Sequence, residues 1–179
     1  MPPVPVLMNN HPPEDHLDYH FVGYGYHLRA AQLVRRLKYE RVTALSSAAA
    51  QMTRNCIEAA GILDEVDLIV PVPIHWRRRA WRGFNQSEIL CEALPKEKVH
   101  HDAMYRTRYT RPQVGLPLNQ RLVNLANSFD AERSLEGARV LLVDDVYTSG
   151  ATARECAKTL KARGASLVGM FALTSSHIS

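Results

Sequence analysis

The segment VLLVDDVYTSGAT, residues 140–152, constrains the fold of this chain more than any other part of the sequence. Four apolar residues, two of them valine, predict a buried strand. Two acids follow, then small and hydroxyl-bearing residues, and the pattern after them predicts a helix. A buried strand that leads through a tight turn into a helix is the repeating unit of a parallel α/β sheet. The segment therefore predicts that fold class.

The rest of the chain alternates between helix and strand patterns in the same way. The segment 106–118 contains Pro112, Gly115 and Pro117 and predicts a long irregular loop. Helices are predicted over 26–39, 44–60, 86–94, 122–129 and 152–163, and strands over 66–73, 138–143 and 166–173, with a weaker strand at 99–105. This alternation favours a central parallel sheet flanked by helices.

Length and composition predict a single domain. The 179 residues are 46% hydrophobic, which is enough for one buried core. The proline-bearing residues 1–18 are expected to be a flexible N-terminal segment, and residues 19–179 are expected to form the domain. The net charge is only +4, but a pI of about 9.1 weakly favours anionic, phosphate-rich ligands.

The cysteines and the apolar runs restrict the compartment. Cys56, Cys91 and Cys156 lie far apart without a CxxC pair, which argues against a disulfide framework and against a four-cysteine zinc module. No basic region followed by an apolar stretch predicts a secretion signal, and no apolar run approaches the roughly 20 residues of a membrane helix. We therefore expect a cytoplasmic protein without membrane insertion.

The residues around the predicted strand end indicate a ligand with two chemically different halves. In an open α/β sheet, ligands bind at the carboxyl ends of the strands. Ser149, Gly150 and Ala151 permit close backbone approach, and the start of the following helix offers N–H groups to an anion such as a phosphate. Asp144 and Asp145 would repel that phosphate, so they are expected to face sugar hydroxyls or a hydrated cation. A phosphosugar satisfies both halves.

The same segment resembles the phosphoribosyl pyrophosphate signature of type I phosphoribosyltransferases. The stretches VPVPIHWRRRAWRGFNQ and RTRYTRPQVGLPLNQRLVNLANSF, together with LKY at 37–39, resemble the ComF/GntX group of that family. The similarity runs from about residue 24 to residue 173. It implies the type I phosphoribosyltransferase fold, with a small hood region beside the sheet.

The resemblance also implies roles for individual residues. Asp144 and Asp145 are expected to hold the ribose hydroxyls, and the turn that follows is expected to hold the 5-phosphate. The segment 75–82 is similar to the loop that binds the diphosphate, and 106–124 corresponds to the flexible loop that closes over the site, with Gln113, Arg121 and Asn124 at its recurrent polar positions. Expected catalytic residues are Asp144, Asp145 and Arg82, and expected ligand-binding residues are Asp144, Asp145, Val146, Tyr147, Thr148, Ser149, Gly150, Ala151, Thr152, His75, Arg77, Arg78 and Arg79.

The cofactor and partners follow from the same resemblance. Magnesium is expected to arrive bound to phosphoribosyl pyrophosphate, with no protein metal site of its own, and a homodimer is possible because type I relatives often dimerise. ComF-type chains usually begin with a four-cysteine, zinc-ribbon-like module that these residues do not contain. A shortened member and a part of a longer protein are both open explanations, and any function that requires the module is in doubt.

Other interpretations of the same residues stay open. The acid pair could belong to a receiver-type phosphorylation site, although only 34 residues follow Asp145. The aromatic and basic segment WRRRAWRGF could bind single-stranded DNA instead of diphosphate, because arginines track a phosphate backbone while aromatic rings stack on bases. The protein would then be an accessory factor of DNA uptake. His16, His20, His100 and His101 are better explained as surface residues than as metal ligands.

Overall fold

The computed structural model describes residues 6–8, 16–24, 36, 43–108 and 125–175. Its main sheet has the strand order β1-β2-β7-β6-β3. The strands are β1 (Val6–Met8), β2 (Tyr19–Tyr24), β7 (Leu167–Ser175), β6 (Arg139–Tyr147) and β3 (Leu68–Pro71). Strands β2, β7, β6 and β3 run parallel to one another, and β1 is antiparallel to β2. This arrangement confirms the predicted parallel α/β class.

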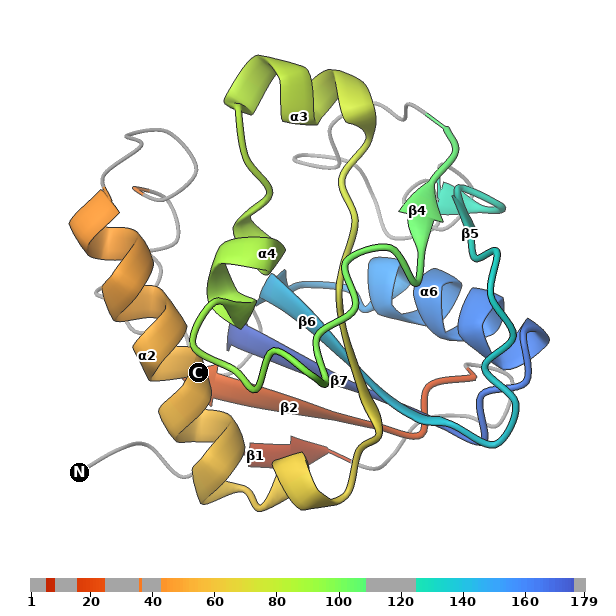
Figure 1. Ribbon diagram of the computed structural model, residues 1–179, viewed down its shortest axis with the longest axis horizontal. Helices are drawn as coiled ribbons and strands as arrows, with labels where there is room; N and C mark the ends of the chain where they lie inside the picture. The colour runs from red at the N-terminus through yellow and green to blue at the C-terminus, as the bar shows by residue number, and fades with distance from the viewer. Residues whose placement is uncertain (1–5, 9–15, 25–35, 37–42, 109–124, 176–179) are drawn as a thin grey trace.

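Helices cover both faces of the sheet (Figure 1). Helices α2 (Thr43–Ala59) and α4 (Gln86–Cys91) lie on one face, and α6 (Ala151–Ala162) lies on the other. Along β6 the side chains alternate between the two cores: Val140 and Leu142 join the α6 side, and Leu141 and Val143 join the α2 side. Since all four are buried, the strand reads as a continuous apolar run, as strands of parallel sheets do.

Several predicted elements differ from those observed. The strand that starts at Arg139 continues through the acid pair to Tyr147, because β7 extends far enough to pair with it at Ser175. Of the predicted strand at 99–105, Val99 forms an isolated bridge with Ile69, and only Tyr105 lies in a strand, at the start of β4. Phe129, predicted on a helix, lies in β5 (Phe129–Asp130), which pairs with β4 (Tyr105–Arg106). A short 3-10 helix, η2 (Ile62–Asp64), follows α2.

Some expectations fall on residues outside the described ranges. These are the helix predicted at 26–39, apart from Arg36, and residues 109–124 of the expected closing loop. Within the N-terminal segment, Val6–Met8 forms β1 and Leu17 is buried, while the boundary before Tyr19 stays a prediction. No helix among the described residues is long and apolar enough to cross a membrane.

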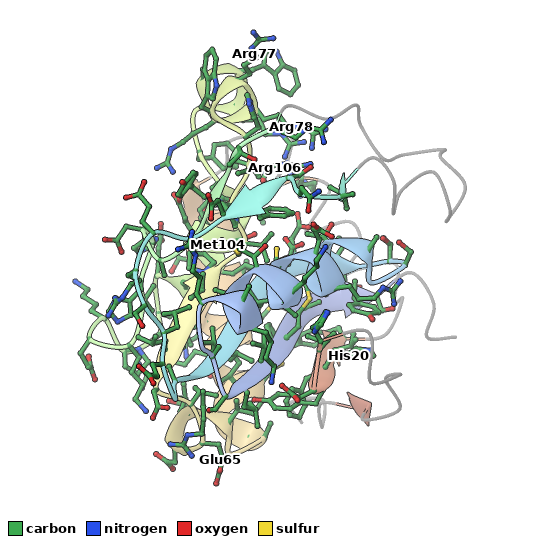
Figure 2. The ribbon with its side chains drawn as sticks, turned by 90° about the vertical axis from the view of Figure 1, so that its right-hand side faces the viewer. His20, Glu65, Arg77, Arg78, Met104 and Arg106 are labelled. Atoms are coloured by element: carbon green, nitrogen blue, oxygen red, sulfur yellow. The ribbon has the colours of Figure 1, made fainter. Side chains whose placement is uncertain are left out.

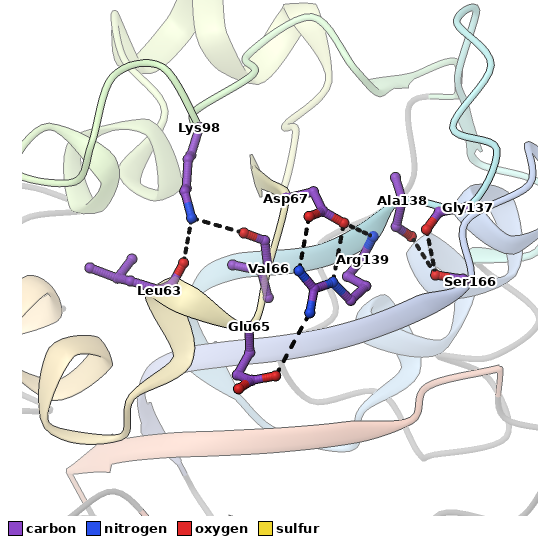
Figure 3. A network of polar contacts seen from close by, with 9 residues as sticks. All are labelled: Leu63, Glu65, Val66, Asp67, Lys98, Gly137, Ala138, Arg139 and Ser166. Atoms are coloured by element: carbon purple, nitrogen blue, oxygen red, sulfur yellow. Dashed lines mark hydrogen bonds and ion pairs between the residues drawn. The ribbon is translucent and has the colours of Figure 1, made fainter.

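A network of polar contacts lies at the amino-terminal edge of the sheet (Figure 3). The Arg139 guanidinium donates to both carboxylate oxygens of Asp67, at 3.0 and 3.3 Å, and the Arg139 N–H donates to the same carboxylate at 2.8 Å. These contacts tie the start of β6 to the residue that precedes β3. Lys98 donates to the carbonyl oxygens of Leu63 and Val66 nearby. The opposite, carboxyl edge of the same strands carries the acid pair.

Candidate functional site

The acid pair lies at the carboxyl end of β6, inside the strand. Asp145 is buried, and Asp144 is half-buried. The Asp144 Oδ1 accepts hydrogen bonds from the Ser87 hydroxyl, at 2.9 Å, and from the Asp145 N–H, at 2.8 Å. Two donors on one oxygen fix the orientation of this carboxylate, so its position is defined by the protein itself.

The turn that follows forms a cradle for an anion. Gly150 has a φ of 72° and begins α6 without a side-chain cap, so no side chain covers the N–H groups of the first helical turn from that position. The Arg154 guanidinium donates to the Ser149 carbonyl oxygen at 2.6 Å, and the buried Ser149 hydroxyl has no hydrogen-bond partner among the described residues. Uncapped N–H groups, a helix dipole and a buried hydroxyl together suit a phosphate.

The Tyr147 side chain packs against this turn at Gly150. A Cβ on Gly150 would collide with the Tyr147 hydroxyl, so only glycine allows the two to approach so closely. The Tyr147 ring is also stacked on the imidazole of His20 in β2. His20 is buried at 6% exposure, so the expectation of a surface histidine was wrong for this residue. Its packing against an aromatic ring accounts for its burial.

The arginine-rich segment, expected as a loop, forms a short helix, α3 (Trp76–Arg82). His75 caps its start, with Nδ1 accepting from the Arg77 N–H at 3.2 Å. Gly83, with a φ of 84°, ends it and donates its N–H to the Arg79 carbonyl oxygen. Because both ends are capped locally, the segment is helical although none of its residues is buried.

Helix α3 stands apart from the sheet (Figure 1), and its residues differ in exposure from one side to the other. Arg78 and Arg82, four residues apart on one side, are half-buried, while Trp76 and Trp81 are 65% and 69% exposed. Arg79 forms an ion pair with Glu88 at 2.6 Å, and Arg82 donates to the Gln86 side chain at 3.0 Å. Arg77 lies over the Trp76 ring, with its guanidinium carbon 5.3 Å from the centroid.

Positive charges gather between α3 and the acid pair. Figure 2 shows Arg78 next to Arg106, below Arg77. Burial, and then the nearby Arg78 charge, lower the pKa of Arg106 to about 10, whereas Asp144 acts in the opposite direction. Burial, followed by the charges of Arg106, Arg77 and Arg78, also lowers the pKa of His75 below its usual 6.5. A bound anion would relieve the repulsion among these cations.

The structure therefore brings together only part of the expected set. The residues from Asp144 to Thr152 lie together at the end of β6, in the turn and at the start of α6. Arg78 and His75 lie close to Arg106, and Arg106 lies close to Asp144. Arg77 and Arg79 instead contact Trp76 and Glu88. Sequence reasoning missed Ser87 and Arg106. An asparagine before a helical pattern, Asn85, signals the cap that places Ser87, whereas Arg106 carries no local signal because a strand pairing places it.

Residues 89–178 match the model of the phosphoribosyl transferase domain. The chain belongs to the phosphoribosyl transferase domain family. The matched range holds the acid pair, the phosphate-type turn and Arg106, whereas α3 lies before it.

Two curated relatives are named for DNA utilization and for competence. DNA utilization protein YhgH of Escherichia coli K12 is 36% identical over 149 residues, which cover 79% of this chain and 65% of that protein. Competence protein F of Haemophilus influenzae is 28% identical over 150 residues, covering 79% of this chain and 66% of that protein. This chain thus spans about two thirds of the length of these relatives.

One solved structure aligns with most of this chain at low sequence identity. UMP synthase of Leishmania donovani aligns with a TM-score of 0.47 and 15% identity, over 80% of this chain and 24% of that chain.

Proposed function

We propose that this protein binds magnesium-phosphoribosyl pyrophosphate and transfers the phosphoribosyl group to a nitrogen nucleophile, with release of diphosphate. The proposal includes a cytoplasmic location and a possible homodimer. The observation that carries it is the juxtaposition of two carboxylates with an uncapped helix start on one side and a cluster of cations on the other. A ligand with a sugar between two phosphate groups matches all three parts.

In this proposal each part of the ligand meets a different part of the site. The turn at Ser149 and Gly150 and the start of α6 would hold the 5-phosphate. Asp144 and Asp145 would accept hydrogen bonds from the ribose hydroxyls. Arg78 and Arg106 would face the diphosphate. Arg82 follows Arg78 by one helical turn on the same side of α3.

The chemistry proposed here needs positioning and charge stabilisation more than a strong base. A nitrogen lone pair forms a bond to ribose C1 as the bond from C1 to the diphosphate oxygen breaks, and the nitrogen then loses a proton to solvent. Negative charge grows on the leaving diphosphate, where Arg78 and Arg106 would stabilise it. Holding the sugar by its hydroxyls and its phosphate keeps C1 in line with both reacting atoms.

Magnesium fits the donors of this site. Asp144 and Asp145 are hard oxygen donors of the kind that suits Mg²⁺ and its water ligands. When bound, Mg²⁺ would neutralise charge on the diphosphate. Within the described ranges, no group of three or more histidine, cysteine, aspartate or glutamate side chains could hold a metal ion.

Ligand binding is tested by thermal unfolding with magnesium and phosphoribosyl pyrophosphate. A ligand at about 100 times its dissociation constant stabilises a protein by roughly 2.7 kcal/mol, so the wild type should melt at a higher temperature. The double variant D144N/D145N should lose this shift. The control D64N/D102N removes two exposed carboxylates from outside the site and should keep it. No shift in the wild type would refute the proposal.

Transfer itself is tested by release of diphosphate. Ammonia, amines and free nucleobases serve as nucleophiles with the wild type and with D144N/D145N. Release that depends on both a nucleophile and the acid pair supports the transferase. If the wild type binds the ligand tightly and none of these nucleophiles provokes release, the protein is a binding protein and not a transferase.

A second candidate function is the binding of single-stranded DNA by α3. Two exposed tryptophans and the exposed Arg77 lie on a helix without buried residues, which suits base stacking and backbone contacts. Relatives named for DNA utilization and competence are consistent with it. The helix also carries Arg78 on its inner side, so one element would serve two ligands.

DNA binding is tested with a fluorescent oligothymidine at several salt concentrations. Its affinity should fall linearly on a log-log plot, with a slope of about −0.7 per phosphate contact. W76A/W81A should weaken binding strongly, whereas Y105A removes an exposed aromatic ring outside α3 and should not. Absence of binding at low salt would exclude this function.

A further inference from the structure

A closed set of hydrogen bonds connects the end of β3, the start of α4 and the first acid of the pair. The Val72 N–H donates to the Val143 carbonyl oxygen at 2.9 Å, which joins the end of β3 to β6 just before Asp144. The Asn85 side-chain amide donates to the Val72 carbonyl oxygen at 3.1 Å. The Asn85 Oδ1 accepts from the Ser87 N–H at 3.2 Å, and the Ser87 hydroxyl donates to Asp144.

Burial makes this path stiff. Asn85 and Ser87 are both 2% exposed, so water does not compete for their hydrogen bonds. Asn85 also caps α4, which fixes the backbone on which Ser87 stands. Buried polar groups that satisfy one another hold a single arrangement, because each rearrangement would leave a donor or acceptor unpaired.

The path begins where α3 ends. Only Gly83 and Phe84 separate Arg82 from Asn85, so a movement of α3 that followed binding of a diphosphate would reach Asn85 almost directly. Arg82 also contacts Gln86, the residue between Asn85 and Ser87. The cation-bearing helix and the carboxylate for the sugar are thus joined through two residues of α4 and its cap.

We propose that Ser87, held by Asn85, is a positioning residue that orients the Asp144 carboxylate for the ribose hydroxyls. This inference rests on the proposed function, since it assigns Asp144 to the sugar. Ser87 contacts no reacting atom in this proposal. Its contribution is to keep one carboxylate oxygen occupied, so that the group cannot turn away from the sugar.

The test compares a ligand that has a ribose with one that lacks it. Calorimetric affinities for magnesium-phosphoribosyl pyrophosphate and for magnesium-diphosphate are measured with wild type, S87A and S87C. Cysteine nearly preserves the size of serine but donates weakly, so S87C keeps the packing. The matched control is S166A, which removes a serine hydroxyl that donates to backbone carbonyl oxygens at the amino edge of the sheet.

Loss of a hydrogen bond to a charged group predicts a phosphoribosyl pyrophosphate affinity about tenfold weaker in S87A and S87C. The diphosphate affinity should stay at the wild-type value, and S166A should match wild type for both ligands. Equal losses for both ligands would show that Ser87 only maintains the structure, and unchanged affinities would show that it does not act on Asp144. Either result overturns the proposal.

Failure of the proposed function gives a different result. In that case the wild type itself does not bind phosphoribosyl pyrophosphate, and crystal structures of wild type and S87A decide the question without a ligand. A turned Asp144 carboxylate in S87A supports the positioning role. A carboxylate in the same place overturns it.

Discussion

The imidazole of His20 lies flat against the ring of Tyr147, with centroids 4.1 Å apart and ring planes inclined by 8°. His20 belongs to β2, which is separated from β6 by β7 in the sheet. The contact therefore bridges two strands that share no hydrogen bonds. Since the Tyr147 hydroxyl lies against Gly150, the stack links β2 to the turn that we propose for the 5-phosphate.

The stack should contribute measurably to stability. Aromatic pairs are worth about 0.5–1.5 kcal/mol beyond their buried area. A double-mutant cycle of H20A and Y147A, in which urea unfolding gives the free energy of unfolding of each protein, should give a coupling energy in this range. The control pair is H20A with W81A. Trp81 is 69% exposed on α3, so the effects of these two substitutions should add to within about 0.5 kcal/mol. Additive effects for His20 and Tyr147 would contradict the prediction.

Gly150 should tolerate alanine less well than another glycine of similar conformation. Gly137 has a φ of 73°, and no atom lies within 4 Å of the place a Cβ would take, so G137A has only the backbone strain, about 1–2 kcal/mol. G150A has the same strain and also a collision with Tyr147, which adds about 1–3 kcal/mol. Chemical denaturation of both variants measures the difference. Equal losses would mean that Tyr147 moves aside without cost.

The sequence predicts the elements that apolar patterns define. Strands β3, β6 and β7 and helices α2 and α6 follow from buried runs or amphipathic spacing, and the acid pair and the turn follow from their place after a strand. Helix α3 has no such pattern, because it buries nothing and depends on His75 and Gly83 as caps. Local composition therefore favoured a loop.

The parts of the site that come from distant segments were beyond prediction. Arg106 reaches the cation cluster because β4 pairs with β5, two segments 23 residues apart between Arg106 and Phe129. Ser87 reaches Asp144 across 57 positions of sequence. A single sequence carries no signal for either contact, since both depend on how the layers pack. His20 was misjudged for the same reason.

Stability should fall at acidic pH partly through His75. Burial, and then the charges of Arg106, Arg77 and Arg78, lower its pKa in the folded protein below 6.5, the value of an unperturbed histidine. Between those two values the unfolded chain binds more protons than the folded one. The contribution of His75 is therefore present above about pH 6.5 and is lost as the pH falls through the lowered value.

Urea unfolding of wild type and H75N from about pH 7.5 to about pH 5 checks this prediction. Asparagine keeps an acceptor for the start of α3 but does not titrate, so H75N should lose less stability on acidification than wild type. H101N, at an exposed position, is the control and should follow the wild type. Parallel curves for wild type and H75N would show that His75 has no part in the acid sensitivity.

The three cysteines should be unreactive in the folded protein. Cys56, Cys91 and Cys156 are free and buried, and burial is the first cause that raises the pKa of each thiol. Because the thiolate is the reacting species, a raised pKa and a covered sulfur both slow modification. Ellman's reagent should find almost no fast-reacting thiol in the native protein and all three in urea. S47C, at an exposed position of α2, should add one fast thiol and serves as the positive control. A fast native thiol in the wild type would reveal local opening of a core helix, and at Cys156 that helix would be α6, which follows the turn.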